Sequence, residues 1–331
     1  MKKILVLGGT NFIGRNLVDR LVETGNHDIT LFNRGQTNPT LHPGLKRIKG
    51  DRNTPTIEQI FNQRWDYIID LSCFYPNSLE HIVHNLKEEP ERYIFISTCS
   101  VYDNDQDQSI LRNEDAPTLS CSEEERVDTS TATYGKRKAA CERILIQSGI
   151  PHTIFRPALV YGPHDNTDRF YYWLYQVKKE QALLLPNQGK STFSVTYVAD
   201  LVQAIEKSLT ATKSSSIYNA TTCPQMSIEQ LIDTAAQVLN KTTHPHNASS
   251  AFLNEAGVSQ WTDLPLWLDC DYFTYDNQRL LNELGTQVSN FKDSVSKTVA
   301  YYDKLGWQPP KFGMDDPTKL GLIQKLADKS S

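Results

Sequence analysis

The sequence predicts an α/β protein whose main part is a Rossmann-type, doubly wound parallel sheet, followed by a smaller, discontinuous C-terminal domain. Three observations support this fold class. Short apolar runs alternate with helical segments through the first half of the chain, a glycine-rich turn follows the first run, and the alternation fades beyond about residue 223. Apolar runs separated by helices are typical of a parallel sheet that is buried on both faces.

Strands are expected where β-branched and aromatic residues cluster, and helices where apolar residues recur every three or four positions. On this basis helices are expected from Ile13 to a stop at Gly25, and over residues 78–86, 133–147 and 200–209. Strands are expected at residues 3–7, 28–33, 45–49, 66–71, 93–97, 152–161, 192–197 and 216–218.

Residues 103–130 interrupt this alternation because they are rich in Asp, Glu, Ser and Thr. We interpret them as a solvated loop, or alternatively as a flexible segment beside an active site. The segment from Trp261 to Trp267 is interpreted as domain core in preference to a lid. The first domain is expected to comprise residues 1–162 and 194–222, and the second residues 163–193 and 223–331.

The bulk composition excludes several classes of protein. The 331 residues, 39% hydrophobic and 22% charged, are typical of a globular protein of one large or two smaller domains. The net charge of −5 offers no positive field to nucleic acid or an anionic membrane, and no apolar stretch approaches the length of a membrane span. The six cysteines include no CxxC pair, which favours free thiols in a reducing, cytoplasmic compartment and argues against a metal site.

The glycine-rich turn at residues 8–14, Gly-Gly-Thr-Asn-Phe-Ile-Gly, joins a predicted strand to a predicted helix. Glycines there let the backbone approach a pyrophosphate, and the helix N-terminus favours its negative charge. Asn11 stands where glycine is common, but asparagine tolerates unusual backbone angles. The turn therefore predicts a dinucleotide-binding first domain, against the alternative of an ordinary strand–helix turn. The binding residues are expected to be Gly8, Thr10, Asn11, Phe12, Ile13 and Gly14.

The second predicted strand ends in Asn33-Arg34-Gly35, without a carboxylate. NAD-binding turns place an acidic residue near this point for the ribose hydroxyl, whereas a guanidinium can pair with the 2′-phosphate of NADP. We therefore expect Asn33 and Arg34 in the cofactor site, and NADP in preference to NAD. Asp51, after the third strand, is either an adenine contact or a plain turn residue.

Tyr134 and Lys138 lie four residues apart on one predicted helix, so both project from the same face. A phenol with a pKa of about 10 is a poor base at neutral pH, but a nearby ammonium favours the phenolate. Such a pair can exchange a proton with a substrate hydroxyl. Tyr175 and Lys179 have the same spacing, but only Tyr134 follows the strand that ends at Thr98. Thr98 can donate a hydrogen bond to the reacting oxygen, or alternatively cap the next turn.

The order of these motifs resembles the short-chain dehydrogenase/reductase superfamily, on its extended or atypical side, over about residues 1–210. The resemblance implies a catalytic triad of Thr98, Tyr134 and Lys138. It also implies that Lys138 binds the nicotinamide ribose and that Ala158 and Val160 lie near the nicotinamide. The residues that carry the resemblance are 8–14, 95–102, 134–138, 156–163 and 194–200.

The resemblance implies an NAD(P)-dependent oxidoreductase or epimerase acting on a hydroxyl/carbonyl group, with a nucleotide sugar as substrate and a homodimer as the expected assembly. Sugar 4,6-dehydratases of similar sequence carry Asp-Glu after the catalytic threonine. Cys99 and Ser100 stand there in this chain, which disfavours dehydration. The subgroup also includes chloroplast stem-loop RNA-binding proteins, so the alternative is an RNA-binding or cofactor-sensing regulator. In the substrate-binding second domain, His164, Asp168 and Arg169 are expected to face the substrate.

Overall fold

The computed structural model describes residues 1–180 and 182–330, and the chain forms two compact units. Unit 1 comprises Met1–Val160, Val198–Thr221 and Tyr275–Val288. Unit 2 comprises Tyr161–Tyr197, Thr222–Thr274 and the residues from Ser289 onward. The two units are described separately below.

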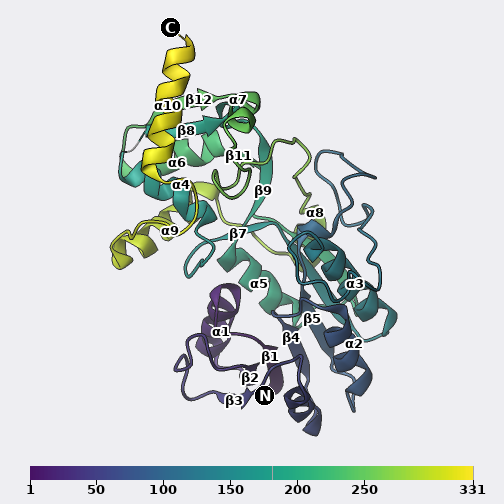
Figure 1. Ribbon diagram of the computed structural model, residues 1–331. Coiled ribbons are helices and arrows are strands. Elements are labelled where there is room, and N and C mark those ends of the chain that lie inside the picture. Colours follow the sequence, from purple (N-terminus) through teal and green to yellow (C-terminus); the bar gives the residue numbers. More distant parts are fainter. Residues whose placement is uncertain (181, 331) are drawn as a thin grey trace. The chain divides into compact units, whose positions relative to one another are not determined.

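Unit 1 is built on a seven-stranded sheet (Figure 1). Its strands are β1 (Lys2–Leu7), β2 (His27–Asn33), β3 (Lys46–Lys49), β4 (Tyr67–Asp70), β5 (Arg92–Ile96), β6 (His152–Pro157) and β10 (Ser216–Ala220). They lie in the order β10-β6-β5-β4-β1-β2-β3, and each neighbouring pair is parallel. The order reverses between β1 and β4, which confirms the predicted doubly wound sheet. In such sheets ligands bind outside the carboxyl ends of the strands at this switch point.

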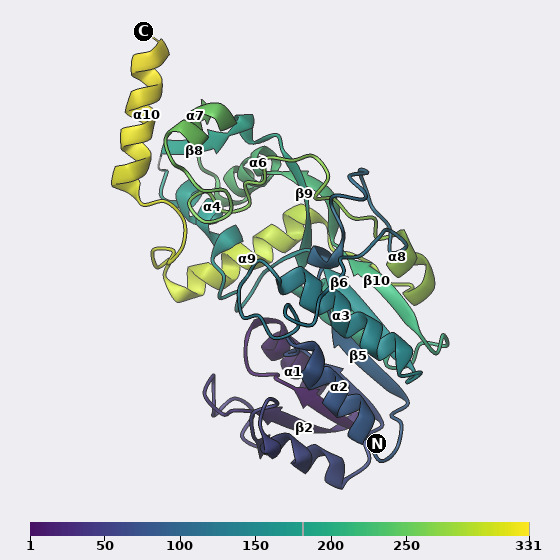
Figure 2. The ribbon, with the colours of Figure 1, turned by 45° about the vertical axis from the view of Figure 1, so that its right-hand side comes forward.

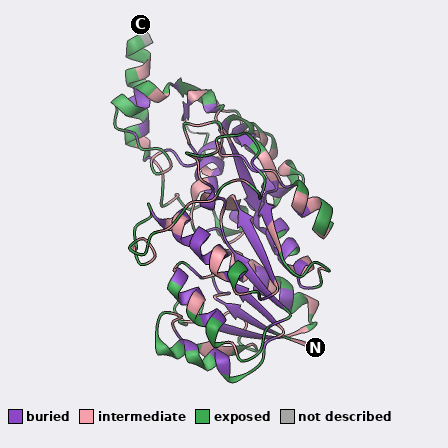
Figure 3. Ribbon diagram, turned by 90° about the vertical axis from the view of Figure 1, so that its right-hand side faces the viewer, coloured by how far each residue is buried: buried purple, intermediate pink, exposed green. Residues whose placement is uncertain are grey.

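Alternate residues of β1 face two separate cores, as the two-residue period of a strand requires. Ile4 and Val6 pack with helices α1 (Phe12–Thr24) and α5 (Val198–Ser208). Leu5 and Leu7 pack with α2 (Pro76–Asn85) and α3 (Tyr134–Gln147), which lie together on the other face (Figure 2). Figure 3 shows the central strands mainly buried and exposed residues on the outer faces of the helices. A 3₁₀ segment, η1 (Pro55–Asn62), completes the second core.

The predicted strand at residues 152–161 is two strands in the structure, so that prediction was wrong in its extent. β6 ends at Pro157, which has no N–H with which to continue the ladder. The short β7 (Leu159–Tyr161) belongs to a different sheet, of order β11-β9-β7. Apolar residues continue through both strands, which is why the sequence pattern alone could not separate them.

The return of residues 275–288 to unit 1 also differs from the prediction, which placed them in the second domain. Helix α8 (Gln278–Leu284) packs against α5 and β10. Leu280 is buried in the core that β1 shares with α1 and α5. The physical reason is that the apolar side chain of Leu280 completes the first core. Because Leu280 is far in sequence from the rest of that core, no local pattern reveals this contact.

Unit 2 combines small sheets with a cluster of packed helices. The sheets are β11-β9-β7, with β9 (Thr192–Tyr197) and β11 (Cys223–Ser227), and the pair β12 (His244–Ala248) and β8 (Ala182–Pro186). Trp267 and Leu264 are fully buried, which confirms the core interpretation for that end of the tryptophan segment. The helices are α4 (Arg169–Lys178), α6 (Ile228–Leu239), α7 (Ser250–Glu255), α9 (Phe291–Leu305) and α10 (Asp316–Ser330), with a short η3 (Asn187–Gly189).

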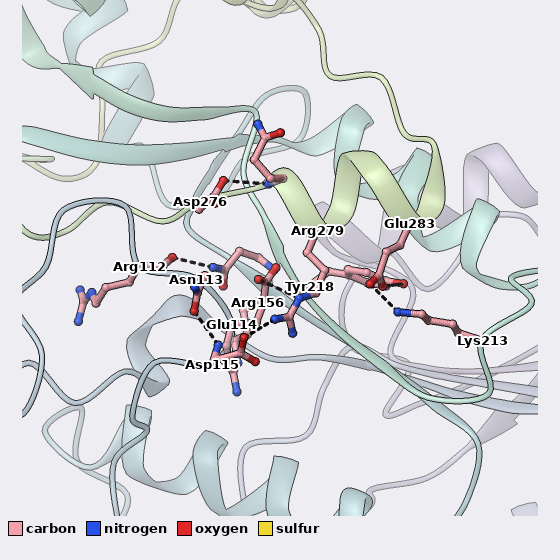
Figure 4. A network of polar contacts seen from close by, with 12 residues as sticks. Arg112, Asn113, Glu114, Asp115, Arg156, Lys213, Tyr218, Asp276, Arg279 and Glu283 are labelled. Atoms are coloured by element: carbon pink, nitrogen blue, oxygen red, sulfur yellow. Dashed lines mark hydrogen bonds and ion pairs between the residues drawn. The ribbon is translucent and has the colours of Figure 1, made fainter.

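Residues 103–130 lie outside helices and strands, as predicted, but buried charges fix the first part of this loop in unit 1 (Figure 4). The Glu114 carboxylate accepts a hydrogen bond from the Asn219 backbone N–H at 2.8 Å, and burial raises its pKa. Arg156 donates to the Glu114 carbonyl at 3.1 Å. Arg156 also forms a buried ion pair of 2.6 Å with Glu142 of α3. Sheet, helix and loop are thus joined by one guanidinium.

Breaking this ion pair is expected to destabilise unit 1. Glu142→Gln leaves the Arg156 charge buried and only partly compensated, which should lower the free energy of unfolding by about 3–5 kcal/mol. The matched control is Glu125→Gln. Glu125 forms an ion pair with Lys136, which lies on the same helix as Glu142, but this pair is partly exposed. We expect a loss of about 0–1 kcal/mol there. Urea unfolding of both variants checks the difference, and equal losses would contradict it.

Candidate functional site

The glycine turn forms a tight cradle between β1 and α1. Gly8 and Gly9 have φ values of +109° and +87°, which side chains disfavour. A Cβ atom on Gly14 would lie 2.8 Å from the Gly9 Cα atom, so helix and turn can approach this closely only with glycine. The first turn of α1 has no acidic residue, and the exposed Asn11 makes no side-chain capping hydrogen bond. The backbone N–H groups at the start of α1 therefore suit an anion such as a pyrophosphate.

The residues predicted at the ends of β2 and β3 have different roles in the structure. Asn33 donates to the Gly8 carbonyl and accepts from the Gly35 N–H, both at 3.0 Å, so its side chain supports the glycine turn. Arg34 beside it is exposed. The Asp51 side chain accepts from the Asn53 N–H at 3.0 Å, which is the geometry of the plain turn residue considered above.

A buried ion pair, which the sequence analysis did not identify, fixes the end of β4. Arg52 contacts both carboxylate oxygens of Asp70, at 2.6 and 2.9 Å, and Tyr93 donates to the same carboxylate at 2.8 Å. Burial alone would raise the pKa of Asp70, but Arg52 and these hydrogen bonds hold it below its usual value. The available signal was an aspartate inside an apolar strand, because such a buried charge needs a partner.

Ser72 joins this pair to the neighbouring strand. Its N–H donates to Asp70 at 3.1 Å, and its hydroxyl donates to the Leu7 carbonyl at 3.2 Å. The carboxyl ends of β1 and β4 are therefore held together at the point where the strand order reverses. This is the edge at which the fold is expected to bind a ligand.

Lys138 is buried at the same edge of the sheet. Its ammonium donates to the carbonyl of Cys73, just beyond β4, at 2.9 Å, and to the carbonyl of Ile96, at the end of β5, at 2.6 Å. The nitrogen also lies 4.0 Å from the centroid of the Phe95 ring, in cation–π geometry. The lysine thus connects α3 to two strand ends and has partners for its charge.

A glycine lets the start of helix α3, which carries Tyr134, approach the turn that Thr98 caps. Tyr134 is the first residue of α3 and is partly exposed. Thr98 accepts from the Ser100 N–H at 3.1 Å and so caps a short turn, η2 (Cys99–Val101). A Cβ atom on Gly135 would lie 2.1 Å from the Ser100 carbonyl oxygen, so the start of α3 lies directly against the turn that Thr98 caps.

The structure therefore gathers most of the predicted residues in unit 1. The glycine turn, Asn33, Arg34 and Asp51 follow β1, β2 and β3, whereas Thr98, Tyr134 and Lys138 lie around the ends of β4 and β5. The half-buried Ala158 and Val160 follow β6. The turns after the parallel strands carry most of these residues, whereas Tyr134 and Lys138 lie on α3 and Val160 lies within β7.

The predicted substrate residues lie in unit 2, where each contacts a neighbour. His164 shares a hydrogen bond of 3.0 Å with the Tyr301 hydroxyl. Asp168 accepts from the Lys311 N–H at 2.9 Å, and the Arg169 guanidinium lies 4.6 Å from the centroid of a Trp261 ring. These contacts shape the segment that precedes and begins α4.

Asp165, in the same segment, has the most unusual acidity among the carboxyl groups of unit 2. Its Oδ1 atom accepts from the N–H and the hydroxyl of Thr167, both at 2.8 Å. Burial nevertheless raises the pKa of Asp165 to about 6. In the sequence, Asp165 follows a Gly-Pro turn, which indicates either a loop residue or one that faces the substrate and does not reveal this burial.

Replacing Asp165 is expected to change the pH dependence of stability. The carboxyl is neutral in the folded protein below about pH 6, whereas an unfolded aspartate ionises near pH 3.9. As the pH rises from about 4 to about 6, the free energy of unfolding of the wild type therefore falls by about 3 kcal/mol relative to that of Asp165→Asn. Unfolding curves at pH 4 and pH 8 test this. A difference between the two proteins that does not vary with pH would contradict it.

The sequence model of the NAD dependent epimerase/dehydratase family matches residues 4–221. The chain belongs to this family. The matched residues include the glycine turn, the Thr98 strand, the Tyr134–Lys138 helix and the segment after β6. The family of enzymes indicated by the motifs is thus confirmed over most of the chain.

Individual relatives are more distant. The chloroplast stem-loop binding protein of 41 kDa b of Arabidopsis thaliana is 29% identical over 66% of this chain, which spans only 58% of that protein. The dTDP-D-glucose 4,6-dehydratase of Mus musculus is 24% identical over 92% of this chain and 89% of its own. The UDP-glucuronic acid 4-epimerase of Bacillus cereus, solved with UDP-glucuronic acid and NAD, has 20% identity and a TM-score of 0.69. That match covers 92% of this chain and 99% of the epimerase chain, and it shows a shared fold.

Within residues 1–180 and 182–330, no three His, Cys, Asp or Glu side chains are grouped so as to hold a metal ion. None of the helices within these ranges has the length and apolar character needed to cross a membrane.

Proposed function

We propose that this family member is a nicotinamide-dinucleotide-dependent oxidoreductase or epimerase that acts on a hydroxyl-bearing carbon of a nucleotide sugar. The observation that carries the proposal is the arrangement of Thr98, Tyr134 and Lys138 at the same sheet edge as an open glycine cradle. A proton-exchanging group and an anion-binding turn at one edge are what such a reaction needs.

The cofactor fits the residues of unit 1. Gly8 and residues 10–14 would hold its pyrophosphate, Lys138 its nicotinamide ribose, and Ala158 and Val160 would lie beside the nicotinamide. Asn33 would act indirectly by supporting the turn. A bound nicotinamide supplies the acceptor and donor of hydride for the substrate carbon.

The chain's own groups then handle the substrate oxygen. Tyr134 accepts the hydroxyl proton as the carbon is oxidised and returns it on reduction. Thr98 donates a hydrogen bond that holds the same oxygen. Lys138, one helical turn after Tyr134 on α3, is fixed by two carbonyls. Reduction from the opposite face of the sugar would give an epimer.

The residue after Thr98 supports oxidation or epimerisation over dehydration. Cys99 is buried, donates to the Arg156 carbonyl at 3.1 Å, and has a pKa raised well above that of a free thiol by burial. Ser100 next to it carries a neutral hydroxyl. Elimination of water needs an additional acid and base, and these two side chains offer neither at neutral pH.

For the substrate we propose a nucleotide sugar, held by unit 2. The support is the ligand of the Bacillus cereus epimerase and the sugar nucleotide in the name of the mouse relative. His164, Asp168 and Arg169 are the proposed contacts, because they lie in one polar segment at the start of α4. Most of the reported relatives are named for sugar nucleotides, which supports an enzyme rather than the RNA-binding alternative.

Tyr134→Phe is expected to lower turnover by about 10²–10⁴-fold, because the variant keeps the ring and loses the proton-exchanging oxygen. The measurement is conversion of UDP-glucuronic acid or UDP-glucose in the presence of oxidised cofactor, followed by nuclear magnetic resonance. Tyr175→Phe is the matched control, since Tyr175 has a lysine at the same spacing and lies in unit 2. Wild-type turnover by Tyr134→Phe would refute the role of the phenol.

For the cofactor we propose NADP in preference to NAD, because exposed Arg34 follows β2 and no carboxylate stands there. Fluorescence titration should show tighter binding of NADPH than of NADH. Arg34→Leu should weaken NADPH binding about 10-fold through loss of the guanidinium–phosphate pair, and leave NADH binding unchanged. A wild-type preference for NADH would defeat the argument.

A further inference from the structure

The segment Cys73-Phe74-Tyr75, which follows β4, is attached residue by residue to helix α3. The Cys73 carbonyl accepts from the Lys138 ammonium at 2.9 Å, and its Sγ atom lies 3.9 Å from that of Cys141. The Tyr75 ring lies 4.9 Å from the Arg137 guanidinium. The backbone on both sides of Phe74 is therefore fixed against the helix that carries Tyr134.

Phe74 itself is not buried by these contacts. The residue is 47% exposed. The other phenylalanines described in unit 1 are not among the exposed large hydrophobic residues. The ring centroid lies 6.3 Å from that of Tyr134 and 6.0 Å from the Lys138 nitrogen. An exposed aromatic ring thus stands directly beside the proposed acid/base pair.

The fold does not require this ring. Lys138 has its closer partners in two carbonyls and in the Phe95 ring at 4.0 Å. Cys73 belongs to the core that covers one face of the sheet, but Phe74 does not. The exposed ring leaves apolar area in water beside Tyr134, and a ligand that covers the ring would bury that area.

We propose that Phe74 is a specificity-determining residue: its ring is the surface on which the sugar of the nucleotide-sugar substrate packs while a sugar hydroxyl meets Tyr134. This inference rests on the proposed function. A pyranose has a polar rim of hydroxyls and an apolar face of C–H groups, and an aromatic ring matches that apolar face. The hydroxyl rim is then free to reach Tyr134 and Thr98. The ring contacts the pyranose of the substrate and contributes nothing to the binding of its nucleotide part.

The test compares ligands that share one part and differ in another. UDP-glucuronic acid, UDP-glucose, UDP and NADH are each titrated by calorimetry into wild type, Phe74→Ala and Phe74→Tyr. Phe312→Ala serves as the matched control, because Phe312 is 54% exposed, lies in unit 2 and has no place in the proposed site. Thermal unfolding verifies that each variant is folded, as expected because both substituted positions are exposed.

We expect Phe74→Ala to weaken the binding of the UDP-sugars about 10-fold, through lost contact with the ring, and to leave UDP and NADH unchanged. Phe74→Tyr should bind like the wild type because it keeps the ring face, and Phe312→Ala should change nothing. Equal losses for UDP and the UDP-sugars would overturn the proposal, as would a loss confined to NADH, which would place the ring on the nicotinamide instead. Wild-type protein that binds none of the uridine ligands would refute the nucleotide-sugar assignment as well, whereas unchanged sugar binding by Phe74→Ala would refute only the role of the ring.

Discussion

The candidate site depends on the hydrogen bonds that the buried ammonium of Lys138 donates to two carbonyls at the ends of neighbouring strands. A lysine charge removed from water costs several kcal/mol unless partners replace the lost hydration. Here the carbonyls of Cys73 and Ile96 and the ring of Phe95 take that place. Helix α3 is consequently tied to the ends of two neighbouring strands. The positions of Tyr134 on that helix and of Phe74 beside it both follow from this attachment.

Buried ion pairs hold the sheet edge on either side of this lysine. Arg52 and Asp70 fix the end of β4, and Arg156 and Glu142 join the end of β6 to α3. Each pair lies where a parallel strand leaves the sheet, so the loops that follow begin from defined positions. Such pairs contribute little net stability compared with apolar packing, and their value here is the geometry they impose. The glycine turn after β1 and the partly exposed Tyr134 lie at the same edge of the sheet as these pairs.

Local features of the fold and the site could be predicted from the sequence, because the residues that define them are close together in the chain. The glycine turn lies within one strand–turn–helix unit, and Tyr134 and Lys138 lie on one helix. The partners of Arg52 and Glu142 could not be predicted, since they depend on which strands and helices become neighbours. The same is true of Leu280, whose burial returns a distant helix to unit 1.

The exposure of Phe74 was also beyond the sequence. A phenylalanine between a buried strand and a helix is usually core, and only its position relative to α3 shows otherwise. Asp51 and Asn33 illustrate the opposite case. Asn33 was predicted in the cofactor site and Asp51 as either an adenine contact or a plain turn residue, and both side chains support turns in the structure. Polar residues at the ends of strands often serve the loop itself.

The central claim is that unit 1 oxidises a sugar carbon at the edge held by Lys138. The most direct measurement follows an isotope. UDP-glucuronic acid with deuterium on its ring carbons is incubated with the protein and oxidised cofactor, and the recovered cofactor and sugar nucleotide are analysed by mass spectrometry. With wild-type protein we predict that the deuterium of the reacting carbon is kept, either on the nicotinamide after net oxidation or on the same carbon of the epimer, and that Lys138→Met converts little substrate. Loss of this deuterium to water during conversion, or equal conversion by both proteins, would contradict the account.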